Sequence, residues 1–184
     1  MAKLSQLITC FGLNILWGIR PRGRRTNSGV SEVRREQKLN TSDDGATLRA
    51  LLQRFPFWMH GRALLGEVSL RHNDVATAYA EAQALRILAR QGSKHQATAL
   101  FLLGRCFLQR GEAASALKLF TEAHDLSPHD HRIQEERSAA CALLGDRAQA
   151  LTILQTIPST HLSAESKAAM QWLSGGAAQA QRNN

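Results

Sequence analysis

From Asp44 onward, the apolar positions of the chain are mostly alanine and leucine, spaced as in helices that bury one face. Both residues lose little conformational freedom in a helix, so this composition favours helical structure. Signals of β-structure are missing, since no run of alternating β-branched residues and no Asn-Gly or Asp-Gly turn between such runs occurs. The pattern therefore predicts an all-α domain.

A separate apolar stretch, residues 4–19, contains no charged residue, and an arginine-rich run at residues 20–25 follows it. Three interpretations are open. As a membrane anchor it is slightly shorter than the roughly 17–25 residues that span a bilayer. As a cleaved signal peptide it lacks a small-residue cleavage site, because Ile19-Arg20 follows the apolar core. As an organelle transit peptide it fits, because no acidic residue precedes Glu32.

Residues 4–19 can also form a hydrophobic helix that lies in a membrane surface, with the arginines meeting anionic headgroups. We predict that the side chains in contact with the membrane are Leu4, Leu7, Ile8, Phe11, Ile15 and Trp17. If the segment spans a bilayer, the arginines and the helical domain are expected on the cytoplasmic side. The alternatives are a soluble cytoplasmic protein or an organelle-targeted one.

The remaining boundaries follow from changes in composition. Residues 26–43 are polar without apolar periodicity, which predicts a flexible linker between the N-terminal segment 1–25 and the helical domain 44–174. The pair Gly175-Gly176 is expected to end the last helix and to leave residues 175–184 as a disordered tail.

The central segment, residues 97–130, carries a spaced set of large, small and turn-forming residues. In order they are Leu100, Leu103-Gly104, Phe107, Gly111-Glu112, Ala116, Phe120, Ala123 and Pro128. This set resembles the tetratricopeptide repeat, a pair of antiparallel helices. The resemblance implies a short α-solenoid of about three such hairpins, because a single hairpin cannot bury its apolar face alone.

Neighbouring units are visible at related spacings. Gly145-Asp146 lies 34 residues after Gly111-Glu112, and Asn73-Asp74 makes the earlier turn. The later unit is degenerate, with Arg137-Ser138 in place of Leu-Gly and Cys141 in place of phenylalanine. The earlier unit has four extra residues, which we expect to lengthen its second helix and the exit from it.

Charge is concentrated outside the helical domain. The chain has a formal net charge of +8, of which residues 1–40 carry +6. The helical domain is therefore close to neutral, and no nucleic-acid partner is expected for it.

Motifs of catalysis and metal binding are missing from the sequence. There is no phosphate-binding glycine loop, no nucleophile elbow and no zinc-protease motif. Three separated cysteines suit neither a disulfide framework nor a zinc site, and the histidines around His129 match no known ligand spacing. We predict no catalytic residue, no metal site and no cofactor.

The resemblance implies that a protein or peptide partner binds a concave groove lined by the first helix of each hairpin. By spacing, the groove residues are Glu67, Arg71, Phe101, Arg105, Leu108 and Arg132, with His60, Glu135 and Ala139 on the same face. Phe101 and Leu108 would anchor the ligand, and the arginines would meet acidic side chains. The expected function is a non-enzymatic scaffold; a structural subunit of a larger assembly and an accessory domain of an enzyme complex are the alternatives.

Overall fold

The computed structural model describes residues 44–182, which contain eight helices and no strand. The helices are α3 (Asp44–Arg54), α4 (Met59–Arg71), α5 (Val75–Leu88), α6 (Lys94–Gln109), α7 (Ala113–Leu126), α8 (His131–Leu143), α9 (Arg147–Thr156) and α10 (Ala164–Arg182). The prediction of an all-α fold is confirmed. The predicted hydrophobic helix at residues 4–19, the arginine run and the linker lie outside the described residues.

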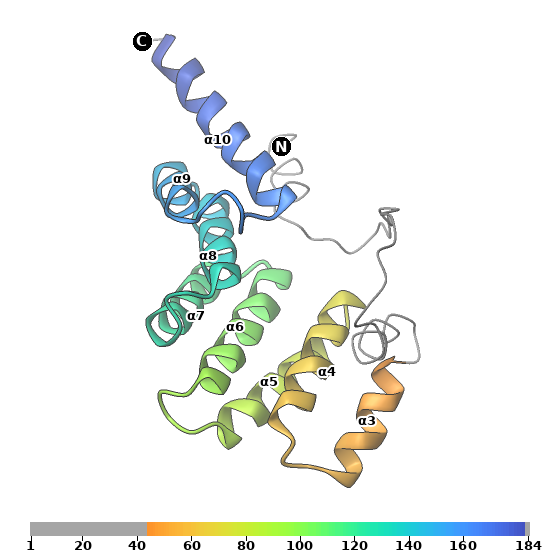
Figure 1. Ribbon diagram of the computed structural model, residues 1–184. Helices are drawn as coiled ribbons and strands as arrows, with labels where there is room; N and C mark the ends of the chain where they lie inside the picture. The colour runs from red at the N-terminus through yellow and green to blue at the C-terminus, as the bar shows by residue number, and fades with distance from the viewer. Residues whose placement is uncertain (1–43, 183–184) are drawn as a thin grey trace, which may run out of the picture.

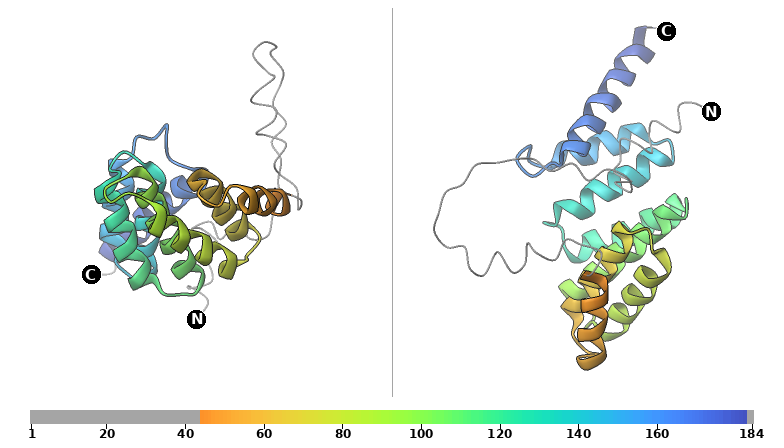
Figure 2. Two further views of the ribbon diagram at one scale, coloured as in Figure 1. Left: turned by 90° about the horizontal axis from the view of Figure 1, so that it is seen from below. Right: turned by 90° about the vertical axis from the view of Figure 1, so that its right-hand side faces the viewer.

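Three antiparallel hairpins, α4/α5, α6/α7 and α8/α9, follow one another along the chain (Figure 1). Figure 2 shows them stacked in sequence order, with α10 projecting from the end of the stack. The second helix of each hairpin packs against the first helix of the next, since α5 contacts α6 and α7 contacts α8. The stack is therefore the short solenoid that the resemblance implied.

The core runs through the stack as a series of clusters rather than as one central mass. Buried residues of α4, α5 and α6 form one cluster, those of α6, α7 and α8 a second, and those of α8, α9 and α10 a third. A further cluster joins α3 to α4. Each cluster shares a helix with its neighbour, so each hairpin depends on the next to bury its apolar face.

The three hairpins turn in the same way. Each turn contains one residue with positive φ, namely Asn73 at 59°, Gly111 at 80° and Gly145 at 90°. The following N–H then donates to the carbonyl five residues earlier, in the pairs Asp74–Ser69, Glu112–Phe107 and Asp146–Cys141, at 2.8, 2.9 and 3.0 Å. This is the Schellman end of a helix, which requires a residue that tolerates the left-handed conformation.

Close helix packing in the second hairpin depends on Gly104. A Cβ at this position would lie 2.5 Å from the Phe120 ring. Phe120 is fully buried, as is Ala116, and its ring lies 6.0 Å from that of Phe101. Phe107 reaches the preceding hairpin, where it meets Tyr79 edge-on at 6.3 Å. The small and aromatic positions of the sequence pattern thus set the helix crossing and the contact with the preceding hairpin.

The third hairpin compensates for its degenerate sequence. Ser138 occupies the position of Gly104 and is fully buried, and its hydroxyl donates to the Ala150 carbonyl at 2.8 Å. Leu154 occupies the position of Phe120 and is smaller, which leaves room for the extra atoms of the serine. Cys141, in the position of Phe107, is buried and contacts Gln149 at 3.1 Å.

Two expectations about helix lengths are wrong. The four extra residues do not lengthen α5, since α5 and α7 both have 14 residues. Three of them lengthen α6, which has 16 residues against 13 in α8, and one lengthens the exit from α5, residues 89–93 against residues 127–130 after α7. Ser93 caps the N-terminus of α6 by accepting from the N–H of Gln96, which starts that helix early. The pair Gly175-Gly176 does not end α10, which continues to Arg182. Glycine costs only about 1 kcal/mol in a helix, and Ala177 and Ala178, which favour helix, follow the pair.

None of the helices within residues 44–182 combines the length and the hydrophobicity needed to cross a membrane.

Candidate functional site

The first helices of the hairpins, α4, α6 and α8, contact one another along one face of the stack. A hollow of about 300 Å³ opens on this face and is bounded at one end by the start of α10. We call it the groove pocket. Its lining residues are Glu67, Phe101, Arg105, Arg132, Glu135, Glu136, Ala139, Ser163, Glu165 and Ser166.

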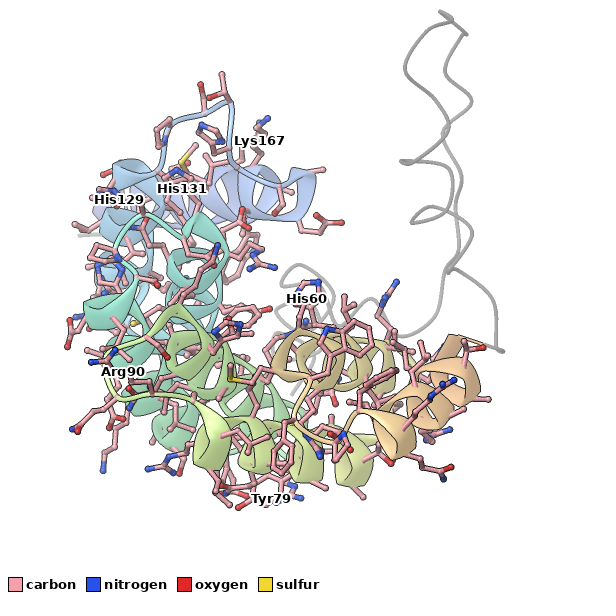
Figure 3. The ribbon with its side chains drawn as sticks, turned by 60° about the horizontal axis from the view of Figure 1, so that its bottom comes forward. His60, Tyr79, Arg90, His129, His131 and Lys167 are labelled. Carbon is pink, nitrogen blue, oxygen red and sulfur yellow. The ribbon has the colours of Figure 1, made fainter. Side chains whose placement is uncertain are left out.

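Four of the six predicted groove residues line this pocket together: Glu67, Phe101, Arg105 and Arg132. The neighbouring predictions Glu135 and Ala139 line it as well. Arg71, Leu108 and His60 do not. Arg71 is exposed at the last turn of α4, Leu108 packs against the core between α6, α7 and α8, and His60 is exposed at the start of α4 (Figure 3).

Phe101 lies deeper than an anchor for a ligand would. It is only 5% exposed, and it packs against Phe120 in the core. The guanidinium groups of Arg105 and Arg132 lie 5.9 and 5.6 Å from the centre of its ring. Phe101 therefore forms the floor of the groove pocket and supports two arginines through cation–π contacts.

Both arginines are paired within the chain. Arg105 Nε lies 3.3 Å from Glu136 Oε1, and Arg132 contacts Asp130 at 3.0 Å and Glu67 at 3.6 Å. Burial raises the pKa of Glu136, with Glu135 adding to the effect and Arg105 opposing it. Glu136 is not among the residues predicted for the groove, although it lies four residues after Arg132 on one face of α8.

The N-terminus of α10 closes the groove pocket at one end. The Ser163 N–H donates to Glu135 Oε1 at 2.7 Å, and the Ser163 hydroxyl accepts from the N–H of Ser166 at 3.1 Å. Ser163 thus caps α10 and also joins α10 to α8. Sequence spacing could not place this end in the groove, because the contact depends on the path of the α9–α10 loop.

Carboxylates outnumber guanidinium groups in the groove pocket. The acids are Glu67, Glu135, Glu136 and Glu165, against Arg105 and Arg132. Four carboxylates against two guanidinium groups give the lining a negative formal charge. This arrangement suits binding of a cationic group.

A second hollow of about 620 Å³ lies where α7 passes to α8. It contains His129 and His131 (Figure 3). It also contains His161, whose ring stacks on that of His131 with centroids 4.7 Å apart. Within the part of the chain that the structure describes, no group of three or more His, Cys, Asp or Glu side chains is arranged to hold a metal ion.

Comparison with known families matches residues 107–173 to the tetratricopeptide repeat. The match begins at Phe107, in α6, and ends at Leu173, in α10, so it includes the degenerate third hairpin. The resemblance seen in the sequence is therefore confirmed for this part of the chain. No curated protein matches the chain significantly. Repeats of this family are generally protein-interaction modules rather than catalysts.

Proposed function

We propose that this chain, whose residues 107–173 form a tetratricopeptide-repeat region, is a non-enzymatic scaffold that binds a short segment of a partner protein in the groove pocket. The observation that supports the proposal most strongly is that six of the nine residues predicted on the groove face, from α4, α6 and α8, lie around one hollow. At about 300 Å³ the hollow accommodates a side chain or two, not a whole domain.

The charge of the groove pocket suggests the chemistry of the ligand. The resemblance implied that the arginines receive acidic side chains of a ligand. In the structure, however, Arg105 and Arg132 already face Glu136, Glu67 and Asp130. A lysine or arginine of the partner would instead meet an excess of carboxylate. We therefore propose a segment with a basic side chain as the ligand.

A positional library of short peptides, presented to the full chain, tests the proposal. We expect selection of arginine or lysine at one position, and loss of that selection in Glu67→Lys and in Glu165→Lys. Glu67 and Arg132 form a partly exposed pair, worth about 0–1 kcal/mol, so Glu67→Lys should still fold. Glu122→Lys makes the same charge change on the exposed face of α7 and is the matched control.

Selection of aspartate or glutamate, or equal selection by Glu67→Lys and the wild type, would contradict a site for basic side chains. If Glu122→Lys loses the selection while Glu67→Lys and Glu165→Lys keep it, the binding surface lies on the second helices of the hairpins, such as α7.

The second part of the proposal is that residues 4–19 hold the scaffold at a membrane, with the repeat domain in the cytoplasm. Support for this part comes from the sequence alone: an uncharged apolar stretch followed by arginines. A full-length double variant, Leu7→Asp with Phe11→Asp, replaces two side chains of the apolar face with charged ones. We expect the wild type in the membrane fraction and the variant in the supernatant; equal distribution of the two would rule out anchoring.

A further inference from the structure

An exposed apolar surface lies at the turn between α3 and α4, at the opposite end of the first hairpin from its Asn73 turn. We call it the aromatic patch; its residues are Leu51, Arg54, Phe55, Pro56, Phe57 and Trp58, around a hollow of about 660 Å³. Phe57 is 77% exposed and Phe55 53%. No residue of the patch lines the groove pocket.

The aromatic patch is held in place rather than frayed. Arg62 donates from Nε and Nη2 to the Pro56 carbonyl at 3.0 and 2.7 Å, and its Nη1 pairs with Glu81 at 2.7 Å. The Trp58 ring covers Gly61 so closely that a Cβ there would overlap it. The backbone N–H of Trp58 also donates to the Phe55 carbonyl at 3.1 Å. A loop fixed by this many contacts presents its aromatic side chains in a preformed arrangement.

A cluster of large apolar side chains in water is unfavourable, because transfer of apolar surface from water to an apolar environment lowers the free energy. Contiguous exposed patches are uncommon on monomers and generally have an occupant. The occupant must be apolar, since the patch contributes only one charged side chain, Arg54, whose guanidinium lies 5.7 Å from the centre of the Phe55 ring.

We propose that the occupant is residues 4–19 of the same chain. The sequence places Leu4, Leu7, Ile8, Phe11 and Ile15 on one face of a helix in this segment. A single apolar helical face is the kind of ligand that an apolar hollow accepts. The proposal is independent of the groove pocket and of its ligand.

The length of the connecting chain fits this placement. Residues 20–43 separate the segment from α3, and a chain of this length has a typical end-to-end distance of about 25 Å. The 11 residues of α3 rise about 16 Å, and the patch begins at its C-terminal end. Effective concentration is highest when the connecting chain matches the span, so docking within one chain is favoured over docking between chains.

Docking would use the same apolar face that we propose for membrane contact, so one segment cannot do both at once. Residues 4–19 would cover the aromatic patch when the protein is away from a bilayer and leave it when they insert.

In the full chain carrying Phe57→Cys, cross-linking of Cys10 to position 57 tests the proposal. The reagent is a short bismaleimide, and the protein is kept dilute. Phe57 is largely exposed, so the substitution should not unfold the domain. Cys106 and Cys141 are buried, and burial raises the pKa of Cys106 to about 11, against the opposing charges of Arg110 and Arg105. These thiols will therefore react slowly. Leu144→Cys, at an exposed apolar site in the turn of the third hairpin, is the matched control.

We expect a cross-link within one chain that forms several-fold faster in Phe57→Cys than in Leu144→Cys. When Leu7→Asp and Phe11→Asp are added to each of these two variants, the variants should cross-link at the same rate. Equal rates without those substitutions would overturn the proposal. A product of dimer mass would assign the patch to a second copy. Protection of the Phe57→Cys thiol by anionic vesicles, with no cross-link in their absence, would assign it to a bilayer.

Discussion

The second and third hairpins have the same backbone turn but different cores. Gly111 and Gly145 both take positive φ, and both are followed by the same backbone hydrogen bond. The pair that fills the helix crossing is Gly104 with Phe120 in the second hairpin and Ser138 with Leu154 in the third. In the second hairpin, the side-chain volume at the crossing comes from the second helix alone. In the third hairpin, both helices contribute a side chain to it.

The difference shows which parts of the repeat are interchangeable. The turn is a local constraint on a single residue, so its chemistry recurs in each hairpin. The crossing is a constraint on summed volume, so two quite different pairs satisfy it. Ser138 also adds a buried hydroxyl, which is tolerated because the Ala150 carbonyl accepts its hydrogen bond.

Exchange of the crossing pairs should have the largest effect on stability. Gly104→Ser puts a side chain against the Phe120 ring and should lower the free energy of unfolding by about 1–3 kcal/mol. Combined with Phe120→Leu, it copies the third hairpin, so the double variant should lose less than the sum of the single losses. Urea unfolding of the four chains gives the coupling energy. Strict additivity would show that the two positions do not share one volume.

Substitution of the turn glycines should have an intermediate effect, equal in the two hairpins. Gly111→Ala and Gly145→Ala each force an alanine into positive φ, at a cost of about 1–2 kcal/mol. Asn73→Gly in the first hairpin should be close to neutral, since asparagine adopts the left-handed conformation more readily than other residues with a side chain. The midpoint of urea unfolding measures all three. Markedly different losses at Gly111 and Gly145 would mean that the turns are not equivalent.

The smallest effect is expected at the seam between the two hairpins. Burial holds the pKa of His124 below its ordinary value, the charge of Arg137 adds to this, and Asp125 opposes it. The unfolded chain therefore takes up a proton at higher pH than the folded chain, and stability falls as pH drops below about 6.5. His124→Gln should reduce this loss in urea unfolding across that range. His60→Gln, at an exposed site, should leave it in place.

Much of the groove pocket could be predicted from repeat spacing, because the first helix of each hairpin presents the same face. This reasoning found Glu67, Arg105 and Arg132. It placed Phe101 on the correct face but misjudged its depth, since spacing gives a direction and not a distance from the core. It also included Arg71 and Leu108, which lie on the first helices but away from the hollow.

The sequence by itself determined the helices, the turns and the order of the hairpins. Those features depend on a few neighbouring residues: a glycine that can adopt positive φ, a capping side chain, or an apolar residue on each turn of helix. Only the tertiary structure decided that Arg132 meets Glu67, that Glu135 holds the N-terminus of α10, and that Phe101 lies beneath two arginines. Charges pair over a few ångströms, and residues 65 apart reach that distance only once the intervening hairpin has packed.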